Sequence, residues 1–101
     1  MPTIKIKHAT NKDSVEAFEK IKEFFQSDET LKKLDPKLSF TFQEAQKSGQ
    51  AKGSQFKADF NVKAAGAGSE IEVVVELPFL LTPFKGKVEE TIQKKLQKYM
   101  A

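Results

Sequence analysis

A chain of 101 residues has room for one domain, which we expect to span residues 1–101, since domains most often hold roughly 100–150 residues. The composition includes no Cys and one His, which excludes a disulfide framework, a thiol nucleophile and a metal site built from Cys or several His. The formal charge of +3 comes from Lys without any Arg. Because Arg is the usual side chain for recognising phosphates and base edges, we expect no nucleic-acid partner.

The beginning of the chain, Met1-Pro2-Thr3-Ile4-Lys5, lacks the apolar run of a signal peptide. No stretch approaches the roughly 20 apolar residues that cross a bilayer, so we expect no integral membrane insertion. We therefore expect a cytoplasmic protein.

Residues 3–8 alternate between apolar and polar side chains, which predicts a short half-buried strand. From Ser14 onward the apolar residues recur at helical spacing, which predicts an amphipathic helix. Its apolar positions are Val15, Phe18, Ile21, Phe24 and Phe25. Three residues near its start have side chains that can cap the first turn: Asn11, Asp13 and Ser14.

The next segment predicts a second, shorter helical turn through Leu31 and Leu34. It ends at Asp35-Pro36, because the residue before Pro avoids the α region. Residues 38–43 alternate again and predict another strand. Lys47-Ser48-Gly49-Gln50 is the expected chain reversal after that strand.

The clearest pattern is a hairpin over residues 56–77. Two alternating apolar rows flank the small-residue loop 64–69, and both rows must face the core. Pairing Val62 with Ile71 satisfies this requirement. Oppositely charged residues then face each other on the solvated side, in the pairs Lys57–Glu76 and Lys63–Glu70.

The last part of the chain predicts a helix capped by Thr82, with Pro83 at its first helical position. Its acidic residues come early and its Lys residues late, as the helix dipole prefers. Gly86 in the first turn costs roughly 1 kcal/mol relative to Ala, which we attribute to a close approach of the helix to the sheet. The apolar stripe comprises Val88, Ile92, Leu96 and Tyr99 or Met100.

The resulting order, β-α-β-β-β-α, predicts an α+β fold. Two helices pack on one face of an antiparallel sheet, and the other face is polar. The uncapped edge of the hairpin allows a homodimer through strand pairing.

No residue pattern indicates an enzyme active site. His8 ends the first strand without an identifiable partner, so we interpret it as a surface or strand-end residue. Glu70, Glu72 and Glu76 have Lys neighbours and indicate a solvated face rather than acid–base catalysis. Gly66-Ala67-Gly68 precedes a strand instead of a helix, which indicates a hairpin loop and not a dinucleotide site. We expect no catalytic residue, cofactor or metal site.

The connection between the hairpin and the final helix carries more large apolar residues than such a link requires. Two interpretations are open. The residues plug one end of the core, or they form a surface element that adsorbs onto a lipid-like or polymer surface beside a Lys-rich helix. The candidates are Phe79, Leu80, Leu81 and Phe84, supported by Lys85 and Lys87.

The run Glu72-Val73-Val74-Val75-Glu76-Leu77, its continuation over residues 79–89 and the N-terminal Ile4-Lys5-Ile6-Lys7-His8 carry a family resemblance. The chain resembles the polyhydroxyalkanoic acid system proteins, small bacterial proteins associated with polyhydroxyalkanoate granule gene regions. The resemblance implies a cytoplasmic, granule-associated accessory protein without enzymatic activity, and it supplies no catalytic residues.

Two functional hypotheses follow. The first is an accessory protein that binds a polyhydroxyalkanoate granule or granule proteins through the six candidate residues of the apolar link. The alternative is a small domain that binds an acyl chain in a cavity of roughly 300 Å³ or more between the helix and the sheet.

Overall fold

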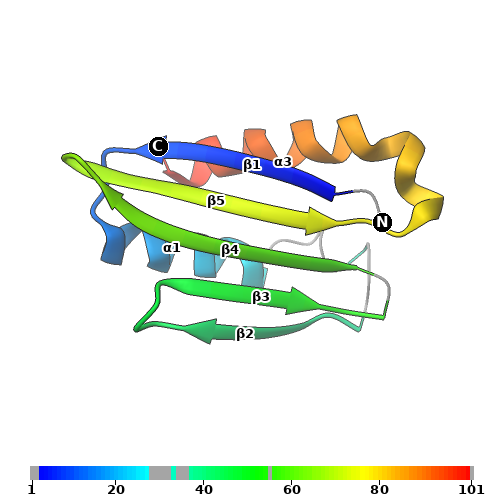
Figure 1. Cartoon of the computed structure of the whole chain (residues 1–101), viewed down its shortest axis with the longest axis horizontal. Helices are drawn as coiled ribbons and strands as arrows, with labels where there is room; N and C mark the ends of the chain where they lie inside the picture. Colours follow the sequence, from blue (N-terminus) through cyan, green and yellow to red (C-terminus); the bar gives the residue numbers. More distant parts are fainter. Residues whose placement is uncertain (1–2, 28–32, 34–36, 55, 101) are drawn as a thin grey trace.

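An antiparallel sheet with helices on one face forms the body of the molecule (Figure 1). In this computed structural model the described residues are 3–27, 33, 37–54 and 56–100. The strands are β1 (Thr3–Thr10), β2 (Ser39–Gln43), β3 (Ser48–Lys52), β4 (Lys57–Ala65) and β5 (Gly68–Glu76). The helices are α1 (Ser14–Ser27), the 3-10 helix η1 (Phe79–Phe84) and α3 (Lys85–Met100).

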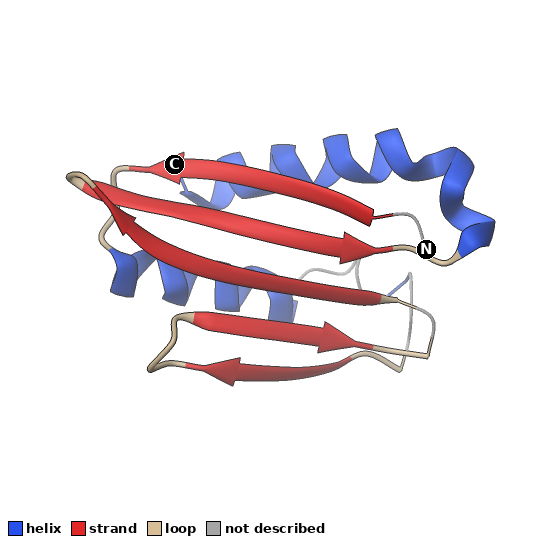
Figure 2. Ribbon diagram, viewed as in Figure 1, coloured by secondary structure: helices blue, strands red, loops and turns tan. Residues whose placement is uncertain are grey.

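The strand order is β1-β5-β4-β3-β2, and each neighbouring pair is antiparallel. β2 to β5 follow one another along the chain, whereas β1 and β2 lie at opposite edges of the sheet. α1 packs across β2 to β5, and α3 packs beside it over β1 (Figure 2). The predicted α+β fold, with two helices on one face of an antiparallel sheet, is confirmed.

The sheet has one strand more than the sequence pattern predicts. The expected reversal at residues 47–50 is wrong, because the turn lies at residues 44–47 and Ser48–Lys52 is strand β3. Lys47 closes this turn with a φ of 52°. Only small side chains face the core from β3, because Gly49 pairs with Phe42 on one side and Phe60 on the other, and their rings fill the space. β3 therefore lacks a visible apolar row.

The predicted hairpin register is confirmed in β4 and β5, where Val62 pairs with Ile71. The pairs Lys57–Glu76 and Lys63–Glu70 are also as predicted. The loop is shorter than expected, because pairing continues to Ala65 and Gly68 and leaves a turn at residues 66–67.

Helix α1 covers the predicted range and is capped by Asp13, one of the three candidates. The Glu16 backbone N–H donates to Asp13 Oδ1 at 2.8 Å. Val15 does not join the core and is 59% exposed, whereas Ala17 is fully buried. The remaining predicted apolar positions are buried.

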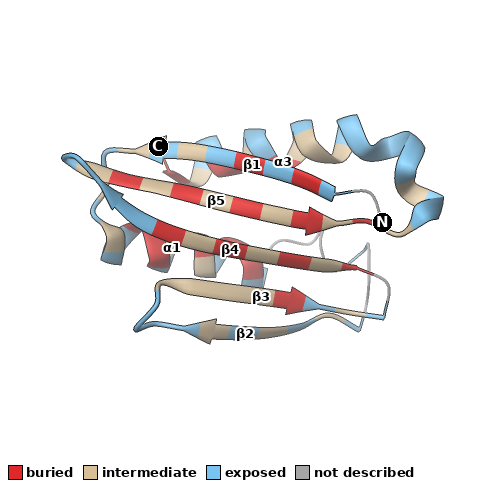
Figure 3. Ribbon diagram, in the orientation of Figure 1, coloured by how far each residue is buried: buried red, intermediate tan, exposed pale blue. Residues whose placement is uncertain are grey.

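The core between the sheet and the helices is rich in Phe rings, with Phe60 of β4 at its centre. Its ring centroid lies 4.8 Å from that of Phe25, 5.9 Å from Phe18 and 6.1 Å from Phe42. Figure 3 shows the alternation of buried and half-buried residues along the strands that this packing requires. α1 and α3 meet through Phe24 and Tyr99, whose rings form an edge-on contact at 5.3 Å.

The start of the last helix differs from the prediction. Thr82 lies inside η1, where its hydroxyl donates to the Phe79 carbonyl at 2.8 Å, and α3 begins at Lys85. Pro83 therefore lies inside η1 and not at the first position of the α-helix. Gly86 does not approach the sheet, since a Cβ there would meet no atom within 4 Å. The first turn of α3 contains no acidic residue, Glu89 and Glu90 follow directly after it, and Lys98 lies in the last turn.

The second helical turn predicted through Leu31 and Leu34, and its end at Asp35-Pro36, lie outside the described residues.

Candidate binding surface

η1 connects the end of β5 to α3 at one tip of the molecule (yellow to orange in Figure 1). Pro78 holds an extended backbone before it, with φ −63° and ψ 152°. The Leu81 N–H then donates to the Pro78 carbonyl at 2.9 Å, which closes the first tight turn. Two prolines and a 3-10 ladder hold this apolar segment in one local conformation.

The structure separates the apolar candidates of this segment by exposure. Phe79 is 72% exposed, Leu80 83% and Phe84 53%. Leu81 is half-buried and packs against the core cluster. One side chain therefore anchors η1 to the core, while three large apolar side chains of the same segment are exposed to solvent.

This surface is distinctive within the described part of the chain. The only other large apolar side chain exposed there is Val15, on α1. Single exposed apolar residues are ordinary, whereas here three lie within six residues of the chain. Lys85 and Lys87 come directly after η1, in the first turn of α3, and both are exposed.

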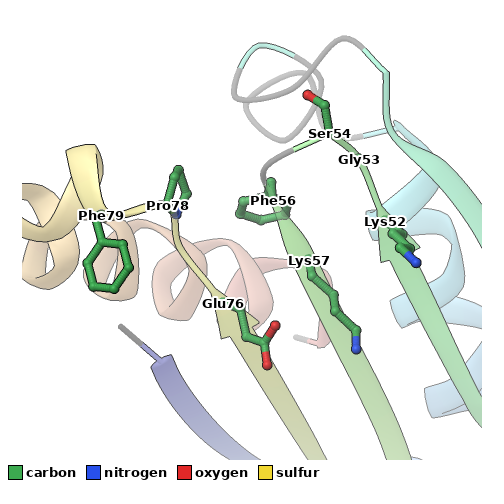
Figure 4. Close-up of a pocket in the computed structure, with 8 residues that line it drawn as sticks. All are labelled: Lys52, Gly53, Ser54, Phe56, Lys57, Glu76, Pro78 and Phe79. Atoms are coloured by element: carbon green, nitrogen blue, oxygen red, sulfur yellow. The ribbon is translucent and has the colours of Figure 1, made fainter. Parts of the chain in front are cut away.

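A groove of about 400 Å³ opens beside Phe79, at the end of the sheet (Figure 4). β3, β4 and the segment leading into η1 contribute its walls. Its lining residues are Lys52, Gly53, Ser54, Phe56, Lys57, Glu76, Pro78 and Phe79. Two further pockets lined by described residues also lie on outer surfaces, one over β2–β4 and one on α1. None of these three pockets lies between the helices and the sheet, where the acyl-chain hypothesis expects a cavity.

The acidic residues singled out in the sequence lie along the open face of β5 among basic and polar neighbours. Lys7 pairs with Glu72 across β1 and β5, with 4.0 Å between Nζ and Oε2. His8 is half-buried on β1, opposite Ile71. Within the described residues, no group of three His, Asp or Glu side chains is placed to hold a metal ion.

One pair of ionisable groups on α3 is clearly perturbed, away from the apolar surface. Lys94 Nζ lies 2.8 Å from Glu90 Oε1. This hydrogen bond and the charge of Lys94 lower the pKa of Glu90, and the same contact raises the pKa of Lys94. Both groups are exposed, so the pair stabilises the surface of the helix and indicates no catalytic role.

The fold and this surface define a class: a small α+β protein with one antiparallel sheet, one helical layer and an exposed apolar tip. The model of the family described as "Putative polyhydroxyalkanoic acid system protein" matches residues 3–100. The chain belongs to this family, as the resemblance of its C-terminal third predicts.

Solved structures share the fold at low sequence identity. TTHA0849 from Thermus thermophilus superposes with a TM-score of 0.58 at 10% identity, over 97% of this chain and 88% of that one. Ara h 8.0201 superposes with a TM-score of 0.56 at 16% identity, over 98% and 97% of the two chains. No curated protein matches the chain in sequence.

Proposed function

We propose that this protein is a non-enzymatic accessory protein of the polyhydroxyalkanoate system that adsorbs to the granule through η1. The observation that carries the proposal is the exposure of Phe79, Leu80 and Phe84, three large apolar side chains within the six residues of η1. The family description supports the polyhydroxyalkanoate context and mentions no enzymatic reaction.

The proposed contact is apolar, with a basic rim. Full burial of a Phe or Leu side chain is worth about 1.5–3 kcal/mol, so three such side chains support reversible adsorption to an apolar polymer. Leu81 holds η1 on the core and contributes indirectly. Lys85 and Lys87 attract acidic groups at the granule surface, which belong either to the ends of the polymer or to granule proteins.

Adsorption through a surface turn requires no inserted helix. In the part of the chain that the structure describes, no helix is long and apolar enough to cross a membrane. We propose a cytoplasmic location on the granule surface, with the granule polymer or granule proteins as partner and no nucleic acid, and the family description supports the granule context.

Co-sedimentation with purified granules tests this proposal. The double variant Leu80→Ser, Phe84→Ser removes two exposed side chains and is expected to keep its circular dichroism spectrum but stay in the supernatant. Val15→Ser is the matched control, because Val15 is also an exposed apolar residue but lies on α1. Retained binding of the double variant would overturn the assignment of the surface.

Granules stripped of protein separate the two candidate partners. Binding to stripped polymer at the same affinity identifies the polymer itself, whereas binding only to native granules identifies a granule protein. If the protein binds neither the native granules nor the stripped granules, the proposed function is overturned.

The hairpin edge expected to be open for strand pairing is covered, since β3 pairs with β4 and β1 pairs with β5. A second copy of the chain is instead a candidate partner at the β2 edge of the sheet. β2 has no charged residue, and the rings of Phe40 and Phe42 are stacked with centroids 6.3 Å apart. An edge strand without charge or proline invites pairing with another chain. Antiparallel pairing about Thr41 would set Phe40 of each copy opposite Phe42 of the other.

Light scattering after size-exclusion chromatography tests this pairing. The wild-type chain is expected to form a dimer that Thr41→Lys dissociates, because two charges would then meet at the symmetry axis. A wild-type monomer, or a dimer that Thr41→Lys leaves intact, would exclude pairing through β2.

A further inference from the structure

The groove beside η1 contains a cross-strand pair of like charges. Lys52 of β3 lies directly opposite Lys57 of β4 on the open face of the sheet. Elsewhere in the described part of this face, charged residues meet opposite charges or neutral side chains, as in the Lys7–Glu72 ion pair. Like charges directly opposite one another are destabilising. An anion bound between the two ammonium groups would relieve this repulsion.

The charges around the groove limit the anion to a low charge. Lys57 has Lys52 on one side and Glu76 of β5 on the other. The three side chains lie on the same face and line the same groove (Figure 4). Their sum is one positive charge, which a single carboxylate neutralises. A phosphate dianion would leave an excess negative charge beside Glu76.

Beyond Glu76, the lining of the groove on the side of η1 is apolar. Pro78 and Phe79 form one wall, and Phe56 closes the groove at the beginning of β4. Figure 4 shows the Phe79 ring on the η1 side, the Lys side chains on the opposite side of the groove and the Glu76 side chain between them. A ligand that spans the groove would therefore have a charged end at the Lys pair and an apolar body against Phe79. The volume of about 400 Å³ falls within the range of small-molecule sites.

We propose that this groove binds an aliphatic monocarboxylate, with the carboxylate between Lys52 and Lys57 and the alkyl chain along Pro78 and Phe79. The inference goes beyond granule adsorption, since of the proposed granule contacts only Phe79 lines the groove. It also places an acyl-type ligand on the outer face of the sheet, and not in the interior between helix and sheet.

Amide NMR titration with sodium octanoate tests the site. Saturable shifts are expected at Gly53, Ser54 and Glu76 and at the two lysines. 1-Octanol tests the need for charge and inorganic phosphate tests the need for an alkyl chain, and both are expected to bind much more weakly. Phosphate binding equal to that of octanoate would overturn the proposal in favour of a general anion site, and equal binding of 1-octanol would overturn the role of the Lys pair.

The double variant Lys52→Gln, Lys57→Gln is expected to weaken octanoate binding about fivefold or more, as for the loss of partly exposed ion pairs. Lys63→Gln is the matched control, since Lys63 lies on the same face of β4 about 20 Å farther along the strand. Unchanged affinity in the double variant, or an equal loss in Lys63→Gln, would overturn the site.

Two further measurements distinguish a loss of octanoate binding from a loss of folding and from a loss of granule binding. Lys52→Gln alone is expected to leave the urea midpoint unchanged or slightly higher, because it removes a like-charge contact. The Leu80→Ser, Phe84→Ser variant is expected to bind octanoate normally, and the double Lys variant is expected to sediment with granules. Loss of octanoate binding in the Leu80→Ser, Phe84→Ser variant would show that the groove is not an independent site.

Discussion

Gly66 and Gly86 are both exposed, and at each of them a Cβ would meet no atom within 4 Å other than those of the local backbone and the adjacent residues. Their backbones differ, since Gly66 has a φ of +58° in the β4–β5 turn and Gly86 lies in α3. Gly86→Ala is therefore expected to raise the free energy of unfolding by about 0.5–1 kcal/mol. Gly66→Ala is expected to lower it by about 1 kcal/mol, because side chains disfavour a positive φ. Urea unfolding measures both, and shifts in the same direction would contradict the assignment.

Gly49 is constrained by space rather than by φ. A Cβ at this position would stand 2.7 Å from an atom of the Phe42 ring and closer still to the Phe60 ring. Gly49→Ala is therefore expected to destabilise the protein by about 1–3 kcal/mol through overpacking. Thermal unfolding checks the loss. A variant as stable as the wild-type chain would mean that the two rings move apart easily.

The Glu90–Lys94 pair predicts a small pH dependence of stability. The pKa of Glu90 is lowered below its ordinary value of 4.5, so its contribution is present above pH 4.5 and is lost as the pH falls through the folded-state value. The pKa of Lys94 is raised above 10.5, so its contribution is present below pH 10.5 and is lost as the pH rises through the folded-state value. Lys94→Gln is expected to return the pKa of Glu90 towards 4.5, which carbon NMR of the carboxyl group measures. An unchanged titration of Glu90 would exclude Lys94 as the cause.

At the scale of elements, α1 depends on a single side-chain cap. Asp13 Oδ1 accepts the Glu16 N–H, and Asp13→Ala is expected to lower the free energy of unfolding by about 1 kcal/mol. Asn11→Ala is the control, because Asn11 is an equally good candidate in the sequence and lies before the helix. Chemical denaturation of both variants compares them. An equal loss in both would contradict the cap assignment.

Element identities were largely predictable, because periodicity is local. The helix of residues 14–27 and the β4–β5 register follow from apolar spacing and charge pairing along the chain. β3 could not be predicted in this way. Its core-facing positions are Gly49 and Ala51, which are too small to produce an alternating row of large apolar residues. The start of α3 differs from the prediction, because Pro83 fits the first turn of a 3-10 helix as well as that of an α-helix, and in the structure it lies inside η1.

At the scale of the whole molecule, Phe60 joins the sheet to α1. Its ring contacts Phe18 and Phe25 of α1 and Phe42 of β2. Phe60→Ala is expected to cost about 3–5 kcal/mol, which is a large part of the stability of a small domain. Phe79→Ala is the matched control and is expected to change stability by less than about 0.5 kcal/mol, because Phe79 is 72% exposed. Calorimetry measures both variants, and similar losses would contradict the different burial of the two rings.

The sequence by itself determined the family, the α+β class and the apolar character of residues 79–84. Each of these depends on residue types and local spacing. Only the tertiary structure decided that Phe79, Leu80 and Phe84 point outward while Leu81 packs inward, because exposure depends on what the rest of the chain leaves uncovered. The same holds for the groove, since Lys52 meets Lys57 only when β3 exists and pairs with β4. Long-range pairing brings these charges together, and no local pattern in the chain encodes it.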